Sequence, residues 1–128
     1  MIVVDTSVII AIEWREPNHQ LFTARILPRE HRFIPATVVV EATTVLSRTN
    51  ADPKAAVEHY MSVLGLTVAA IDEAIAAAAQ DAFLRFGKGR HPARLNVCDC
   101  FSYATAKVLG APLLFVGNDF AQTDIRAA

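Results

Sequence analysis

The sequence contains little of what marks a disulfide-held or membrane-bound protein. Its only two cysteines, Cys98 and Cys100, would point about 200° apart on a helix and are poorly placed to bridge each other. A thiolate zinc site needs about four nitrogen or sulfur ligands, and the four histidines are scattered along the chain. No apolar run reaches the ~18 residues that cross a bilayer, and Asp5 makes the amino terminus acidic too early for a signal peptide. We therefore expect a cytoplasmic protein with no membrane segment.

The chain also lacks a strong charge of either sign and any internal division. Its net charge is −1, so no overall basic field attracts nucleic acid, and such a partner would need a local basic patch. No linker, repeat or low-complexity tract interrupts the sequence. With 53% hydrophobic residues among 128, the chain is long enough to bury a core. These features predict one domain spanning residues 1–128.

What the chain does contain is a regular alternation of strand-like and helix-like segments. Short runs of apolar and β-branched residues predict strands, and capping residues mark the starts and ends of the helices between them. The expected strands are residues 2–4, 32–35, 66–71 and 112–117, and the expected helices are residues 6–15, 20–27, 36–48, 53–64, 73–86 and 96–110. This order predicts an α/β domain with a mainly parallel sheet, in which sites form beyond the carboxyl ends of the strands.

Four acids occupy positions where carboxylates are unusual. Asp5 and Asp119 follow the first and last expected strands, and Glu41 falls on the apolar face of its helix. Asp99 lies in the covered part of a helix that is apolar nearly all round, with Cys100 on its one polar side. Two like charges ~4 Å apart repel by ~4 kcal/mol at an effective dielectric near 20, so converging acids need a cation. Their oxygens suit Mg²⁺ or Mn²⁺, the usual apparatus of phosphoryl chemistry.

Each acid also has an ordinary structural interpretation, and the sequence leaves these alternatives open. They are a helix cap for Asp5, a surface ion pair with Arg48 for Glu41, a hydrogen bond from Tyr103 for Asp99, and a turn for Asp119.

Taken together, the stretches that carry the four acids resemble the motifs of a known family. VVDTSVIIAI, ATVVVEATTVL, LNVCDCFSYATAK and PLLFVGNDFAQTDI are similar, in order and spacing, to the acid-bearing motifs of PIN domains. The resemblance covers Ile2 to Ile125 and is strongest to the VapC-type toxins of bacterial toxin–antitoxin pairs. RFGKGRHPARLN, which precedes the third acid, also looks like a branch of that group.

The resemblance implies a fold and an activity. It implies a three-layer α/β/α domain with sheet order 3-2-1-4-5, and an endoribonuclease toxin that hydrolyses RNA with metal-activated water. Mg²⁺, or alternatively Mn²⁺, would be held by the catalytic acids Asp5, Glu41, Asp99 and Asp119. A cognate VapB-type antitoxin would neutralise the toxin, and homodimers are typical of the group. A non-catalytic PIN-like module that binds RNA or protein is the alternative function.

Further residues are assigned supporting roles by the same resemblance. Thr6, Ser7 and Asn118 are expected to hydrogen-bond the carboxylates or bound waters. Asp124 is a supporting acid, and whether it or Asp119 is the better fourth acid is left open.

Two surfaces are candidates for contact with other molecules. The segment GKGRHPAR contains no acid, and we assign Lys88, Arg90, His91 and Arg94 to phosphate contacts, the alternative being a merely solvated loop. Trp14, Leu21 and Phe22 in the first helices predict an apolar groove for an antitoxin helix or tail, although such side chains also fill cores.

Overall fold

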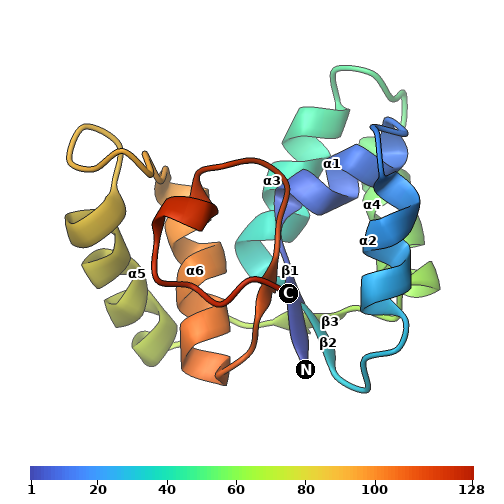
Figure 1. The fold of residues 1–128 in the computed structure, drawn as a ribbon. Helices are drawn as coiled ribbons and strands as arrows, with labels where there is room; N and C mark the ends of the chain where they lie inside the picture. Colours follow the sequence, from blue (N-terminus) through green and yellow to red (C-terminus); the bar gives the residue numbers. More distant parts are fainter.

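The computed structural model describes residues 1–128, with a parallel sheet between two layers of helices (Figure 1). The strands are β1 (Ile2–Val4), β2 (Arg32–Pro35), β3 (Thr67–Ala69) and β4 (Leu113–Leu114). The helices are α1 (Thr6–Glu13), α2 (His19–Ile26), α3 (Ala36–Leu46), α4 (Pro53–Val63), α5 (Glu73–Phe86), α6 (Val97–Leu109) and the short 3-10 helix η1 (Phe120–Gln122). The predicted succession of elements is confirmed, although β3 and β4 are shorter than the sequence indicates. No helix has both the length and the apolar character needed to cross a membrane.

The four strands lie in the order β3-β2-β1-β4, and every neighbouring pair is parallel. This agrees with the expected order over its first four positions. The expected fifth strand is reduced to one bridge between Leu113 and Ala127, held by Leu113 N donating to Arg126 O and Ala128 N donating to Leu113 O, both at 2.9 Å. This segment makes only one rung with β4.

Side chains of β1 alternate between two separate cores. Ile2 and Val4 pack with the cluster beneath α1 to α4, whereas Val3 packs with the cluster beneath α5 and α6. All three are fully buried, because β1 lies between two other strands and both of its faces are covered by helices. The three-layer α/β/α prediction is therefore confirmed, and β1 lies between the two layers of helices.

The predicted helix ends are confirmed where a capping residue marks them. Asp52 accepts from Ala55 N at 3.1 Å and Asp72 accepts from Ile75 N at 2.9 Å. Gly110 ends α6 with a φ of +64°, a left-handed conformation that an L-residue adopts only with strain.

The predicted orientation of α6 is partly wrong. Val97 and Val108, on a helix expected to be covered nearly all round, are 67% and 43% exposed, whereas Cys100, expected on its polar side, is only 3% exposed. The reason is that α5 packs along the Cys100 side of α6. A helical wheel cannot show which side a neighbouring helix covers. Both cysteines are free, as predicted.

Candidate functional site

Asp5 is the most enclosed of the four acids, with 4% of its surface exposed. It follows β1 directly and caps α1, where its Oδ2 accepts from the backbone N–H of Ser7 at 3.1 Å and from the Ser7 hydroxyl at 2.7 Å. Its Oδ1 accepts from the hydroxyl of Ser102, also at 2.7 Å. The helix-cap interpretation of Asp5 is thus correct. Capping does not explain what balances the negative charge of Asp5, because all three donors are neutral and no basic side chain is paired with this carboxylate.

Ser7 also connects two loops at this edge of the sheet. Its Oγ accepts from the backbone N–H of Val116 at 3.0 Å, so the segment after β4 is tied to the segment after β1. The carboxyl ends of two adjacent strands are joined through the same hydroxyl that holds Asp5.

Asp99 lies half-buried in the first turn of α6, in a reciprocal cap with Asn96. Asp99 Oδ2 accepts from Asn96 N at 3.0 Å, and Asn96 Oδ1 accepts from Asp99 N at 2.9 Å. Burial raises the pKa of Asp99 to about 7, against the lowering effect of the Asn96 N–H. The other causes, all of which raise this pKa, are the charges of Asp5, Glu41 and Asp119. Three carboxylates distant in sequence therefore act on Asp99.

Glu41 lies on α3 and lines a hollow of about 550 Å³ together with Cys98. It is half-exposed rather than inward-facing as predicted, because the buried face of α3 runs through Val38, Ala42 and Leu46. It makes no ion pair with Arg48. Burial, and after it the hydrogen bond and charge of Glu41, raise the pKa of Cys98 to about 12, so this thiol stays protonated.

Asp119 is exposed, although the sequence places it among acids expected to converge at the end of the sheet. It precedes η1, its carbonyl accepts from Gln122 N at 3.2 Å, and its side chain makes no cap. The turn interpretation of Asp119 is therefore correct for its backbone. Its carboxylate still contributes to the raised pKa of Asp99.

Asp124 is hydrogen-bonded to a tyrosine and two basic residues, and to none of the four acids. Its Oδ1 accepts from the Tyr103 hydroxyl at 2.5 Å, and its Oδ2 accepts from Lys107 Nζ at 3.1 Å and from Arg85 Nη2 at 3.5 Å. The Tyr103 hydrogen bond, more than any other cause, lowers the pKa of Asp124. The proposed pairing of Tyr103 with Asp99 is therefore wrong, and Asp124 is neutralised by basic partners instead of joining the acids.

The side chains of Thr6 and Asn118 make no hydrogen bond to the carboxylates. Thr6 Oγ1 is buried without a hydrogen-bond partner, and Asn118 is exposed, with only its carbonyl accepting from Gln122 Nε2 at 3.4 Å. Of the residues predicted to support the acids, only Ser7 is bonded to one of them.

The four carboxylates are suitable ligands for a hard divalent cation, although their positions do not form a complete binding site. All four carboxylates lack a basic partner, and oxygen ligands of this kind suit Mg²⁺ or Mn²⁺. No three His, Cys, Asp or Glu side chains are arranged to hold one metal ion. Terminal carboxylate torsions are broad, so rotation of these side chains is the adjustment that an ion would require.

Comparison with known proteins identifies the family of this chain. The family model "PIN domain" matches residues 2–126. The chain belongs to the PIN-domain family. It is 43% identical over 125 residues to Ribonuclease VapC36 of Mycobacterium tuberculosis, covering 96% of this chain and 90% of that one. It is 37% identical over 126 residues to Ribonuclease VapC of Mycolicibacterium smegmatis, covering 98% of each.

Solved structures share the fold at lower identity. VapC20 of M. tuberculosis, described as a sarcin–ricin-loop-cleaving toxin, superposes with a TM-score of 0.76 at 18% identity, covering all of this chain and 98% of the other. VapBC2 of Rickettsia felis, solved on a promoter DNA fragment, gives 0.77 at 11% identity with the same coverage.

In this PIN domain the basic segment forms a closed loop before α6. Gly87 and Leu95 pair at its base, where Lys88 N donates to Leu95 O and Leu95 N to Phe86 O. Leu95 immediately precedes Asn96, the cap of α6. The loop is therefore anchored within a few residues of Asp99.

The basic side chains of this loop differ in how free they are. Lys88 and Arg94 are exposed and unpaired, and Arg90 Nε donates to the Leu84 carbonyl at 3.3 Å. His91 Nδ1 accepts from Ala93 N at 3.0 Å, and its ring meets the Phe86 ring edge-on at 5.1 Å. His91 thus supports the loop from within.

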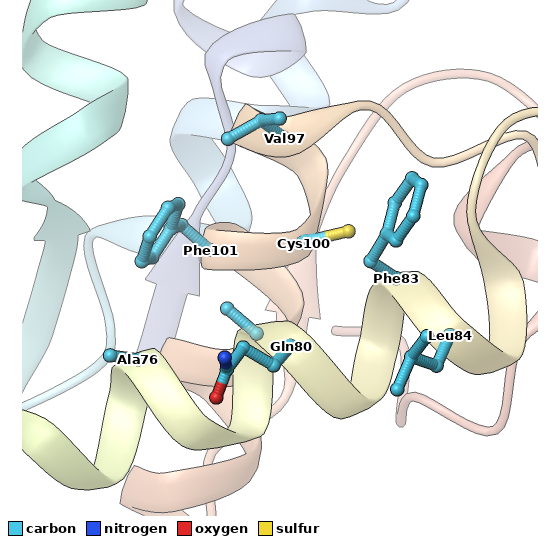
Figure 2. Close-up of a pocket in the computed structure, with 8 residues that line it drawn as sticks. Ala76, Gln80, Phe83, Leu84, Val97, Cys100 and Phe101 are labelled. Carbon is cyan, nitrogen blue, oxygen red and sulfur yellow. The ribbon is translucent and has the colours of Figure 1, made fainter.

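An apolar hollow of about 330 Å³ opens between α5 and α6 (Figure 2). Figure 2 shows Phe83 and Leu84 on α5, with Val97 and Phe101 on α6. Leu84 and Val97 are 58% and 67% exposed. Val97 is adjacent in sequence to Cys98, which lines the hollow beside Glu41.

Sequence reasoning did not identify Ser102 as a contact of the acids. Ser102 is fully buried on α6, and it donates to Asp5 from a position 97 residues away in sequence. The available signal was its spacing, because a residue three positions after Asp99 shares its helix face.

Proposed function

We propose that this PIN domain is an Mg²⁺- or Mn²⁺-dependent endoribonuclease and the toxin of a type II toxin–antitoxin pair. The observation that carries the proposal is the buried carboxylate of Asp5 at the carboxyl end of β1, which accepts hydrogen bonds from neutral donors alone and has no basic partner. Glu41, Asp99 and Asp119 also lack a basic partner, and burial together with the charges of the other three acids raises the pKa of Asp99. The names of the VapC relatives, which are ribonucleases, support it.

In this proposal the acids hold the ion and the surrounding groups orient the acids. Asp5 and Asp99 are the principal ligands, directly or through water, with Glu41 and Asp119 completing the negative site. When bound, the ion lowers the pKa of an attacking water and stabilises the leaving oxygen of a phosphodiester. Ser7 fixes one oxygen of Asp5, and the Asn96 cap restricts Asp99. Although the chain is almost neutral, it binds RNA through the exposed basic side chains of its basic loop, chiefly Lys88, Arg90 and Arg94.

We further propose a VapB-type antitoxin as the partner. Solved relatives of the fold include a toxin–antitoxin complex from Klebsiella pneumoniae and VapBC-1 from nontypeable Haemophilus influenzae. Around α1 and α2, Trp14, Leu21 and Leu27 are 40%, 54% and 44% exposed, an apolar surface that suits an antitoxin helix. An unneutralised acid cluster would also attract an antitoxin arginine.

We propose a homodimer that uses the exposed apolar side chains of α3, α5 and α6. Val40, Leu84 and Val97 are each more than half exposed, and they line two apolar hollows, one of which includes Val97 and the other its sequence neighbour Cys98. A symmetric dimer covers the same patch on both copies.

A direct test compares RNA cleavage by the purified chain with Mg²⁺, with Mn²⁺ and with EDTA, alongside Asp99→Asn. Cleavage that requires the metal and is lost in the variant supports the proposal, whereas full activity in EDTA or in Asp99→Asn contradicts it. The second candidate is a non-catalytic binding module, which the absence of a ready three-ligand group favours. That candidate predicts RNA binding with no cleavage under any of these conditions.

A further inference from the structure

Ser102 makes the only side-chain hydrogen bond between α6 and Asp5. Its hydroxyl donates to Asp5 Oδ1 at 2.7 Å, and both residues are almost completely buried. The two other donors to this carboxylate, the N–H and hydroxyl of Ser7, both act on Oδ2. Ser102 is therefore the sole neighbour that fixes Oδ1.

The position of Ser102 on α6 links the two principal acids. It lies three residues after Asp99, on the same face and one turn further along. The hydrogen bond holds the helix that bears Asp99 against the strand end that bears Asp5. Without it, Ser7 would still hold Oδ2, but the carboxylate plane could rotate, because this terminal torsion is broad.

We propose that Ser102 is a positioning residue, which sets the orientation of the Asp5 carboxylate and leaves the remaining lone pair of Oδ1 for a divalent cation. This inference rests on the proposed function of the acid cluster and deepens it. Groups that orient metal ligands in this way typically contribute about 10- to 100-fold to metal affinity. Ser102 acts through Asp5 and does not touch the ion.

The chain offers a matched control on the same helix. Thr105 is also buried, with 1% of its surface exposed, and its hydroxyl donates to the Phe101 carbonyl of its own helix at 2.7 Å. Thr105→Val removes a buried hydroxyl one turn from Ser102 without touching Asp5. If the effect of Ser102→Ala came only from a less stable helix or from the loss of a buried hydroxyl, Thr105→Val would show the same effect.

The test measures Mn²⁺ binding by calorimetry in the absence of RNA, together with kcat and KM for RNA, for wild type, Ser102→Ala and Thr105→Val. We expect Mn²⁺ affinity to fall about 10-fold in Ser102→Ala, with a lower kcat and an unchanged KM, while Thr105→Val matches wild type. Wild-type Mn²⁺ affinity in Ser102→Ala, or an equal loss in Thr105→Val, overturns the positioning role alone. If the wild-type protein itself binds no Mn²⁺, both the proposed function and this inference are overturned.

A second variant covers the case in which Ser102→Ala does not fold. Ser102→Cys retains a side chain of similar shape with a weaker donor, and circular dichroism establishes that it is folded. We expect its Mn²⁺ affinity to lie below that of wild type and of Thr105→Val. Equal affinity in all three proteins overturns the inference.

Discussion

Asn96 and Asp99 cap each other at the start of α6. Each side chain accepts from the backbone N–H of the other, at 2.9 and 3.0 Å. This cap holds Asp99 where burial and three other acids raise its pKa to about 7. The helix start therefore fixes an acid in a place where its charge is unfavourable unless a cation is present.

The first prediction concerns the metal-free stability of Asp99→Asn. The folded pKa of Asp99 lies above its ordinary value of 3.8, so the folded state binds the proton more tightly than the unfolded state. Stability should then fall as pH rises from about 4 to about 7 and level off above that. Asn keeps the accepting oxygen of the cap and removes the charge. We expect Asp99→Asn in EDTA to melt about 4 °C or more above wild type at pH 8, where about 1 kcal/mol corresponds to such a shift.

Thermal melts at pH 5 and pH 8, with and without Mg²⁺, provide the check. The advantage of the variant should shrink at pH 5, where the wild-type acid is protonated, and Mg²⁺ should stabilise wild type more than the variant. An equal or lower melting temperature for Asp99→Asn at pH 8 would contradict the claim that the charge of Asp99 destabilises the metal-free protein.

Local sequence signals predicted the elements and the placement of Asp5. A β-branched run followed by an acid predicts the buried strand and its polar end, because both depend on neighbours in the chain. The side of α6 that carries Cys100 could not be predicted, since it depends on where α5 packs. The role of Ser102 depends on a partner 97 residues away, and the separation of Asp124 from the acids depends on Lys107 and Arg85.

The second prediction distinguishes the two candidates for the fourth acid. The charge of Asp119 acts on Asp99, whereas Asp124 is bound by Tyr103, Lys107 and Arg85. We expect Asp119→Asn to lower kcat about 10-fold or more, in line with other groups around a metal. Asp124→Asn should lower the melting temperature and leave kcat close to wild type. Single-turnover cleavage and thermal melts of both variants check this, and the reverse pattern would make Asp124 the functional acid.

The third prediction concerns self-association through the apolar patch of α3, α5 and α6. Leu84→Glu places a charge on an exposed apolar residue beside the hollow of Figure 2. In a symmetric dimer that charge enters the interface twice, and burying an unpaired charge is strongly unfavourable. Light scattering should show a dimer for wild type and a monomer for Leu84→Glu. Val63→Glu, on a 53% exposed residue of α4, is the matched control and should remain dimeric. A monomeric wild type, or a dimeric Leu84→Glu, would contradict this interface.

The last prediction concerns the basic loop and the salt dependence of RNA binding. Neutralising a phosphate releases counterions, so each phosphate contact contributes about 0.7 to the slope of log K against log salt for single strands. Reversing the charge of Lys88 or Arg90 should weaken RNA binding and flatten this slope. The measurement uses Asp99→Asn as the background, so that bound RNA is not cut. Lys54→Glu, which reverses an exposed charge on α4 paired with Glu58, is the control and should leave the slope unchanged. If Lys88→Glu and Arg90→Glu also leave it unchanged, the loop is merely solvated and RNA is held elsewhere on the domain.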